Sequence, residues 1–342
     1  MTDGTMTRWT ISAHDIATLR PETLPIPSPG PGEVLVKIGA VALNYRDKMV
    51  VETGMGLPLS LPVSPASDMA GRVLATGAGV SRFKTDDRVI AQFIPDWIDG
   101  RRPGGAWPLP LDTLAGTLPG LLATHAVLPE DWLVAAPRSL DDAGAATLPV
   151  AGLTAWMALV EYGRIRAGDT VLVQGTGGVA LFGLQIARAH GARVLVTSGS
   201  ADKLAQARAL GADHGIDRGA GDWAAAAVAA TGGRGVDHLL EVAGGAGLGT
   251  SLRALAPGGR ISVIGVLDGA EISANVKPLL TKAPVIQGIA VGHRRGLEDL
   301  VRAVDMLGLQ PVIARRYRPD AIREAFAHLD RGPFGKLVIE MD

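Results

Sequence analysis

Residues 170–190 constrain the fold of this chain more than any other stretch. A short apolar run, 171–173, leads into the glycine-rich sequence Gly175-Thr176-Gly177-Gly178. Apolar residues then recur at helical spacing from Val179 to Ala189. The stretch therefore predicts a strand, a tight loop and a helix, with glycines where the loop must turn sharply.

The loop carries the pattern G-x-G-x-x-A. In this pattern Gly175 makes the turn, Gly177 lets a phosphate approach the backbone, and Ala180 allows helix and strand to pack closely. The N-terminus of the helix adds free N–H groups and the positive end of a dipole. The loop residues predicted to contact the pyrophosphate of a dinucleotide are Gly175, Thr176, Gly177, Gly178 and Val179. A doubly wound domain that binds another phosphate ligand, or none, is the alternative.

The segments after the loop continue the alternation of strand and helix. Strands are predicted at 193–197, 214–217, 236–241 and 261–265, with a turn at 257–259. Helices are predicted at 201–210, 222–230 and 248–255. Strands and helices that alternate at this spacing indicate an α/β fold with a doubly wound parallel sheet, the Rossmann arrangement.

The end of the second strand of such a domain distinguishes the two nicotinamide dinucleotides. An acidic residue there would bind the ribose 2′-hydroxyl, and no carboxylate stands at this strand tip. Ser198, Ser200 and Lys203 offer donors and a positive charge that suit a 2′-phosphate, so NADPH is favoured over NADH. Against this, Asp202 would repel a phosphate. The alternative is that Ser200 only caps the next helix and Lys203 lies on the surface.

Further cofactor contacts are expected where other parallel strands end, because ligands of doubly wound sheets bind there. These strand ends supply Val242, Ala243, Ile264, Gly265, Val266, Ile289, Ala290 and Val291. Backbone groups of Val266 and Val291 would bond the carboxamide and ribose. Thr154 is expected on the nicotinamide side, or as an ordinary residue at the start of a helix. Lys336 is expected to reach the cofactor phosphates, unless it is a surface lysine.

Composition excludes several classes of function. The chain has no cysteine, so it contains no disulfide, thiol nucleophile or thiolate metal site. Its net charge is −1 and no basic stripe is present, which argues against nucleic acid and membrane partners. No run of eighteen apolar residues occurs, and residues 1–10 lack a signal core, so a cytoplasmic protein is expected.

Residues 1–150 have a different pattern, with short strands predicted at 33–38, 71–76, 88–92 and 125–128. The stretch 95–119 is rich in glycine, proline and tryptophan and predicts little regular structure. Trp97 and Trp107 in this stretch are candidates for an apolar wall over a planar substrate. They would equally serve to pin the loop to the core.

Motifs along nearly the whole chain resemble one known family. They are Pro-Gly-Pro-Gly-Glu-Val-Leu-Val at 29–36, Asn-Tyr-Arg-Asp at 44–47, Pro-Ala-Ser-Asp-Met-Ala-Gly at 65–71, the stretch 79–89, Ala-Ala-Thr-Leu-Pro at 145–149, Gly-Leu-Thr-Ala-Trp at 152–156, the phosphate loop and Gly-Lys at 335–336. The chain resembles the medium-chain dehydrogenase/reductase superfamily, in its zinc-free branch of quinone oxidoreductase-like, zeta-crystallin-type enzymes.

The resemblance implies a chaperonin-10-like (GroES-like), mostly β catalytic domain at 1–150 and 291–342. A Rossmann dinucleotide-binding domain would occupy 151–290, with the active site in the cleft. The resemblance also implies a homodimer, in which the apolar stretches 261–267 and 285–291 would extend a sheet across two subunits. A covered core strand is the alternative for these stretches.

The departures from the zinc-dependent relatives concern the metal. In those relatives a cysteine stands at the position of Asn44, a histidine at that of Ser67 and often a cysteine at that of Ala151. Only the acidic Asp68 remains, and a single carboxylate cannot hold a catalytic zinc. The lobe of a structural zinc would fall at 95–119, which has no cysteine. No metal is expected.

Without zinc, another group must stabilise the negative charge that develops on oxygen. Tyr45 lies in the motif that faces the nicotinamide in the resembled family, and its phenol can donate a hydrogen bond and then a proton. A structural tyrosine under the cofactor is the alternative. Asn44 would position the ribose and Tyr45. Asp47 and Asp68 would orient Arg46 or a water, or form a buried structural pair with an arginine.

These features together predict an NADPH-dependent oxidoreductase that transfers hydride to a small-molecule quinone or α,β-unsaturated carbonyl compound. A conjugated acceptor delocalises the new charge itself, which suits a site without metal. One alternative is metal-free reduction of a ketone, aldehyde or imine, or the reverse alcohol oxidation. Another is an NADPH-binding protein with a structural or RNA-binding role.

Overall fold

The computed structural model describes residues 4–103 and 112–341. The chain divides into two compact units, Met1–Leu153 with Val291–Asp342, and Thr154–Ala290. The sequence predicts these breaks at 150/151 and 290/291. No helix among the described residues is both long and apolar enough to cross a membrane.

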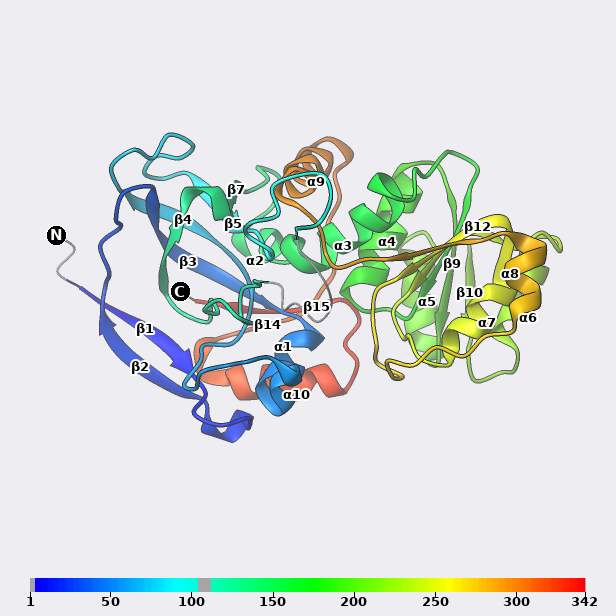
Figure 1. Cartoon of the computed structure of the whole chain (residues 1–342), viewed down its shortest axis with the longest axis horizontal. Coiled ribbons are helices and arrows are strands. Elements are labelled where there is room, and N and C mark those ends of the chain that lie inside the picture. The colour runs from blue at the N-terminus through cyan, green and yellow to red at the C-terminus, as the bar shows by residue number, and fades with distance from the viewer. Residues whose placement is uncertain (1–3, 104–111, 342) are drawn as a thin grey trace. The chain divides into compact units, whose positions relative to one another are not determined.

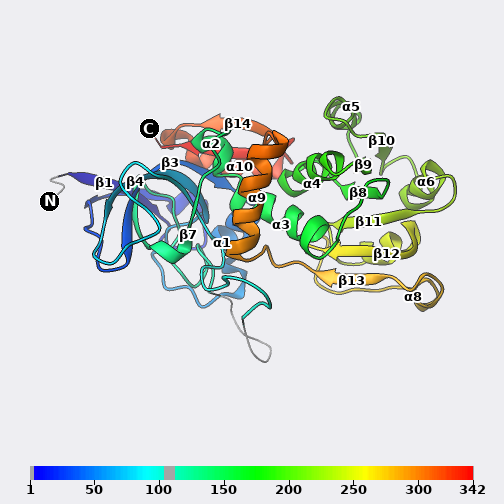
Figure 2. The ribbon, with the colours of Figure 1, turned by 90° about the horizontal axis from the view of Figure 1, so that it is seen from above.

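The unit Thr154–Ala290 is built on a six-stranded parallel sheet, in the order β10-β9-β8-β11-β12-β13 (Figure 2). The order reverses direction at β8, which is the switch point of a doubly wound sheet. The strands are β8 Thr170–Gln174, β9 Arg193–Ser198, β10 His214–Asp217, β11 Val236–Glu241, β12 Leu255–Val263 and β13 Val285–Gly288. The predicted α/β fold class is confirmed.

Helices connect these strands. α4 packs against β8 and β9, and α5 packs against β9 and β10. α6 and α7 contact each other, and right-handed crossovers place them on the opposite face of the sheet. The helices are α3 Leu153–Trp156 with the π-helix Met157–Glu161, α4 Gly178–Ala189, α5 Ala201–Ala209, α6 Trp223–Ala230, α7 Gly247–Ala254 and α8 Val276–Lys282.

β12 differs from the sequence prediction because it begins six residues earlier than 261, at Leu255. The turn expected at 257–259 lies inside the strand as an irregularity: Val236 pairs with Leu255, but His238 pairs with Arg260. Gly258 has a φ of +74°, which glycine adopts without strain. The strand therefore passes through the glycine pair instead of starting after it.

The other unit contains a seven-stranded sheet in the order β14-β15-β3-β4-β5-β7, with β6 also paired to β3 (Figure 1). β3 is its longest strand and pairs with β4, β6 and β15. A separate hairpin is formed by β1 and β2. The strands are β1 Thr5–Thr10, β2 Arg20–Pro25, β3 Glu33–Leu43, β4 Asp68–Thr76, β5 Arg88–Ala91, β6 His125–Pro129, β7 Leu133–Ala135, β14 Ile313–Tyr317 and β15 Lys336–Glu340.

Segments distant in sequence complete this unit. β15 pairs antiparallel with β3, so that Leu337 lies opposite Leu43. α10 packs against β15 and α1, and α9 packs against β7. The helices are α1 Tyr45–Thr53, α2 Asp142–Ala145, the π-helix Leu148–Gly152, α9 Arg294–Leu307, α10 Ile322–Asp330 and the 3-10 helices Ile16–Thr18, Gly54–Gly56, Glu130–Trp132 and Pro319–Ala321.

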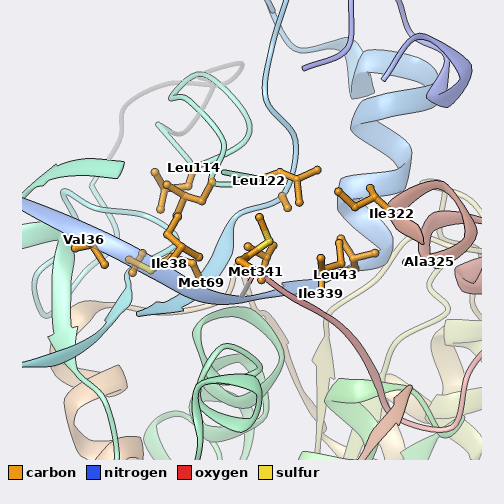
Figure 3. Packing of buried hydrophobic residues seen from close by; sticks show 14 of the residues in the cluster. Val36, Ile38, Leu43, Met69, Leu114, Leu122, Ile322, Ala325, Ile339 and Met341 are labelled. Carbon is orange, nitrogen blue, oxygen red and sulfur yellow. The ribbon is translucent and has the colours of Figure 1, made fainter. Parts of the chain in front are cut away.

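The apolar core of this unit lies between its sheet and the helices α1 and α10. Figure 3 shows Ile38, Leu43 and Met69 from the sheet near Ile339 and Met341 from the tail. Ile322 and Ala325 of α10 close the same cluster. Because tail residues supply part of the core, the early and late parts of the sequence fold as one unit.

Candidate functional site

The glycine-rich loop follows β8 and leads into α4, as the sequence predicts. Gly175 has a φ of +75°, the left-handed region that favours glycine. Around Gly175 and Gly177 there is open space where a Cβ atom would stand. Gly177 caps α4 without a side chain, so the first N–H groups of α4 receive no side-chain acceptor from the cap. This arrangement suits the phosphates of a dinucleotide.

A buried polar network that was not predicted from the sequence lies next to this loop. Gln174 ends β8, Glu241 ends β11, and both side chains are buried. Gln174 Nε2 donates to Glu241 Oε2 at 2.9 Å and to Ser251 Oγ at 3.0 Å. The backbone N–H groups of Ala243 and Gly244 donate to Glu241 Oε1, both at 3.1 Å. The network ties the loop after β11 to the loop after β8.

One signal in the sequence marks this network. Gln174 and Glu241 are polar residues that directly follow apolar strand runs, at the carboxyl ends of neighbouring parallel strands. Such ends lie at the ligand-binding edge of a doubly wound sheet. Polar residues at strand ends are therefore a usable sign of positioning groups as well as of direct ligand contacts.

The end of β9 contains no acidic residue. Ser198 Oγ accepts a hydrogen bond from Ser200 N at 3.2 Å, and Ser200 Oγ accepts one from Lys203 N at 3.4 Å. Ser200 thus caps α5, as one of the two readings expected. The structure adds Arg218, which follows β10 and whose backbone N donates to Ser198 O at 3.0 Å. Arg218 is exposed, and the sequence analysis did not select it.

The other strand-end candidates differ in exposure. Val242, Gly265 and Ala290 are half-buried. Val266 is 52% exposed, and Thr154 is only 2% exposed. Val291 has a φ of +59° and belongs to the first unit, with residues 1–153.

The catalytic candidates gather at the N-terminus of α1. Asn44 precedes the helix, and Tyr45 is its first residue, with 44% of its surface exposed. Asp47 lies one turn further on and is fully buried. Its Oδ2 atom accepts a hydrogen bond from the backbone N of Asn44 at 2.8 Å. This bond fixes the start of the helix, where a carboxylate also complements the helix dipole.

Lys336 contacts the start of α1. It begins β15, is only 4% exposed, and donates from Nζ to Leu43 O at 2.7 Å and to Asn44 Oδ1 at 2.6 Å. Burial lowers the pKa of its ammonium group, whereas Asp68 and Asp47 act in the opposite direction. Lys336 is therefore not a surface lysine, and its ammonium group is bonded within the unit of residues 1–153 and 291–342 instead of extending towards solvent.

Two carboxyl groups balance the buried cations. Asp68 is fully buried, accepts from Ser67 Oγ at 2.8 Å and from Val150 N at 3.2 Å, and has its pKa raised by burial. Burial and the neighbouring Asp68 raise the pKa of Asp47 to about 6, although Arg46 lowers it. Arg46 donates to Ala115 O at 3.0 Å and lies 4.9 Å over the ring of Phe93.

The residues at the metal-ligand positions do not fit a zinc ion. Asn44 Oδ1 is bonded to a lysine ammonium, the Ser67 hydroxyl to Asp68, and Ala151 has no donor atom. Catalytic zinc requires three N, S or carboxylate ligands. Among the described residues, no group of three His, Cys, Asp or Glu side chains is placed to hold a metal. The cluster is a network of hydrogen bonds and charges in which Asn44 Nδ2 and Asp47 Oδ1 have no hydrogen-bond partner among the described residues.

Trp97 is 3% exposed and packs with Phe93, Ile94, Val150 and Val291. Its indole N–H donates to Gly100 O at 3.0 Å. These contacts favour the reading in which Trp97 pins the loop to the core. Trp107 lies outside the described residues.

Two family models match the chain. One is described as the alcohol dehydrogenase GroES-like domain and covers residues 30–138. The other is described as zinc-binding dehydrogenase and covers residues 178–307. Together they span both units of the structure and more than half of the sequence.

Relatives of the full length are also found. A zinc-type alcohol dehydrogenase-like protein of Schizosaccharomyces pombe is 38% identical over 333 residues, covering 95% of each chain. A quinone oxidoreductase of Sus scrofa is 29% identical, covering 92% of this chain and 91% of its own. A solved structure from Sinorhizobium meliloti 1021, provisionally described as an alcohol dehydrogenase, is 60% identical with a TM-score of 0.97, covering 100% of both chains.

Proposed function

Because the chain belongs to the medium-chain dehydrogenase/reductase superfamily and is an oxidoreductase of that family, we propose a finer assignment. The protein is an NADPH-dependent reductase that works without zinc. Its substrates are quinones or α,β-unsaturated carbonyl compounds. The reaction adds one hydride and one proton across the acceptor, so an enone gains hydride at its β-carbon and a proton at its α-carbon.

One observation carries this proposal. At the positions that hold zinc in the zinc-dependent relatives, Asn44 is bonded here to Lys336 and Ser67 to Asp68, and Ala151 has no side-chain donor. A saturated carbonyl needs a Lewis acid or strong proton donor to accept hydride, because the charge stays on one oxygen. A conjugated acceptor spreads that charge. The network therefore supports a conjugated substrate, which needs no metal to stabilise the negative charge that hydride transfer creates.

NADPH is the proposed hydride source, and when bound its reduced nicotinamide supplies the hydride. Gly175, Gly177 and the first N–H groups of α4 would hold its phosphates. Ser198, Lys203 and Arg218 would hold the 2′-phosphate, because the end of β9 has no acid to bind a free 2′-hydroxyl. Glu241 would keep the loop after β11 in place for the cofactor.

Tyr45 is the proposed proton donor. It begins α1 and remains 44% exposed, so its hydroxyl is accessible to a ligand. A phenol can donate a hydrogen bond to the enolate oxygen and then transfer its proton to that oxygen. The enol then tautomerises to the product that is protonated at the α-carbon, and solvent returns a proton to the phenolate. Asn44, which is held by Lys336, would orient the reactants beside Tyr45.

The test is oxidation of NADPH by chelator-treated protein with a panel of acceptors. The panel contains 1,4-benzoquinone, an acyclic enone, an acrylate ester, a saturated ketone and an imine, with NADH run in parallel. We expect turnover of the quinone or the enone, and preference for NADPH. Turnover of only the ketone or imine would overturn the activated-acceptor assignment and make Tyr45 the acid of a carbonyl reductase.

Carbonyl reduction and alcohol oxidation form the second candidate, because two of the similar proteins are described as alcohol dehydrogenase-like. Binding of NADPH without turnover of any acceptor would instead favour a binding role. RNA would be a poor partner for such a role, since a net charge of −1 offers little attraction to phosphates.

A further inference from the structure

The orientation of the Asn44 side chain is determined by Lys336. A lysine ammonium has three donors and no acceptor. The amide of Asn44 must therefore turn its oxygen towards Lys336, and Oδ1 lies 2.6 Å from Nζ. A flipped amide would place the N–H groups of Asn44 Nδ2 against those of the Lys336 ammonium group, with no acceptor between them. The amino group Nδ2 consequently points away from Lys336.

The Asn44 amino group is a buried donor without a hydrogen bond in the described part of the chain. It lies near Asp68 and lowers the pKa of that carboxyl, but it forms no bond of proper geometry with it. Buried polar groups are nearly always hydrogen-bonded in folded proteins. A ligand that brings an oxygen acceptor into this cluster beside Tyr45 would satisfy this buried donor, in competition with the nearby Asp68 carboxyl group.

The backbone holds Lys336 firmly in this place. Its N–H donates to Val312 O at 2.8 Å, and the following residue, Leu337, pairs with Leu43 in the sheet. Gly335 has a φ of +98°, and a Cβ atom there would collide with the Val312 carbonyl oxygen. Only glycine fits before Lys336, so the strand delivers the ammonium to one position.

We propose that Lys336 is a positioning residue, which holds Asn44 by its Oδ1 atom and thereby presents the Asn44 amino group to an oxygen acceptor of the ligand in the hydride-transfer site. The acceptor belongs either to the ribose or carboxamide of the cofactor or to the carbonyl of the substrate. The inference rests on the proposed function for the identity of the ligand, but not for the orientation of Asn44.

A competing view is that Lys336 only neutralises the buried carboxyl groups. Both Asp68 and Asp47 act on its charge. The variant Lys336→Met would then lose activity only because it leaves a buried negative charge uncompensated. Its melting temperature would fall together with its activity. The two views separate in the double variant Lys336→Met/Asp68→Asn, which removes one charge of each sign and keeps the cluster balanced.

The chain has only two asparagines, Asn44 and Asn275, which allows a direct measurement. Selective 15N labelling of asparagine gives one pair of side-chain NH2 signals for each. Asn275 is exposed and caps α8 by accepting from Lys277 N at 2.8 Å, so it is an internal reference. The signals are recorded for the free protein, with NADP+ alone, and with NADP+ and an acyclic enone.

We expect the Asn44 signals to move on ligand addition, while those of Asn275 stay. Movement with NADP+ alone assigns the acceptor to the cofactor, and movement only with the enone assigns it to the substrate. The Asp68→Asn substitution itself adds a third pair of asparagine signals, which the single variant Asp68→Asn identifies. In Lys336→Met/Asp68→Asn the Asn44 signals should no longer respond to the ligand. Unresponsive Asn44 signals in the wild-type protein, or the same response in the double variant, would overturn the proposal.

Kinetics give a second readout. Lys336→Met should lower kcat/KM about 100-fold, because a misplaced reacting group costs about that much. The double variant should regain the melting temperature but not kcat/KM, whereas full recovery of kcat/KM would show that Lys336 only neutralises charge. Lys84→Met, at an exposed lysine of the same unit, is the control. If the wild-type protein turns over no acceptor, the proposed function fails, and the asparagine signals still decide the role of Lys336.

Discussion

The Asp47 carboxyl group is fully buried at the start of α1, and its Oδ1 atom makes no hydrogen bond in the described chain. Burial first, and then the neighbouring Asp68, raise its pKa from 3.8 to about 6. A carboxyl group whose pKa is higher in the folded state binds its proton more tightly when folded. Its contribution to stability is therefore full below about pH 4 and is lost as the pH rises through about 6.

The variant Asp47→Asn cannot ionise at this position, so its stability should not share this loss. Relative to the wild-type protein, its free energy of unfolding should rise by about 2 kcal/mol between pH 4 and pH 7. Urea unfolding at a series of pH values measures this difference. The exposed Asp96, changed to Asn, serves as a control that should parallel the wild-type protein. Parallel curves for Asp47→Asn would contradict the assigned pKa.

At the end of β9, the cofactor preference should depend on Lys203 and Arg218. Removing both, in Lys203→Ala/Arg218→Ala, should raise the KM for NADPH about tenfold or more, since charge-assisted hydrogen bonds contribute about 1.5–3 kcal/mol. The KM for NADH, which lacks the 2′-phosphate, should hardly change. Initial rates with both cofactors test this, with Lys84→Ala as the control. An equal rise for both cofactors would speak against a 2′-phosphate site.

Individual residues differ in how well the sequence predicts their roles. The glycines of the phosphate loop are predictable, because the turn, the close approach and the helix start all lie within a few neighbouring residues. The role of Lys336 is not predictable from the sequence, because its partner Asn44 lies 292 residues away. Glu241 and Ser251 were missed for a similar reason, since only the packing of α7 on the sheet brings them together.

Among the secondary structure elements, β13 is an edge strand with exposed apolar side chains. It pairs with β12 on one side only in the described chain. Val285 and Ile286 are 42% and 44% exposed, and Leu280 of the adjacent α8 is 78% exposed. An open, apolar edge strand is a template for pairing with another strand. A second copy of this chain is the proposed partner, joined through β13.

Replacing Ile286 with lysine should convert a dimer into a monomer, because a charge at an edge strand opposes pairing. The side chain is already half-exposed, so the fold of the monomer should be retained. Light scattering after size-exclusion chromatography gives the mass of each species. Met306→Lys, at an 85% exposed position on α9, is the matched control and should remain a dimer. A wild-type monomer, or an unchanged mass for Ile286→Lys, would refute this interface.

The elements of the doubly wound sheet were predictable from local patterns, because strand and helix alternate along the sequence with clear glycine stops. The elements of the unit that contains β3 and α1 were less predictable from local patterns. The sequence analysis did not identify α1, since the side chains of Asp47 and Lys48 are buried in it and its apolar spacing is irregular. It also predicted β3 only as far as residue 38, although pairing with β15 extends the strand to Leu43.

For the whole molecule, zinc should be irrelevant to activity. The chain contains no cysteine for a structural zinc site, and at the catalytic zinc positions Asn44 is bonded to Lys336 and Ser67 to Asp68. Protein purified from zinc-supplemented medium should contain no stoichiometric zinc by elemental analysis. Its rate of NADPH oxidation should be the same before and after dialysis against a chelator. A rate that falls on chelation and returns with added zinc would contradict the proposed mechanism.

The pairing of β15 with β3 also has a consequence for how the protein is made. Residues 154–290 form a continuous unit that can fold while the ribosome is still translating. The other unit lacks β15 and Lys336 until residues 336–340 have been synthesised. Until then, Asp47 and Asp68 of this unit lack the positive charge of Lys336. We therefore expect chaperones to bind the nascent chain mainly at residues 1–153. This binding should continue long after these residues have left the ribosome.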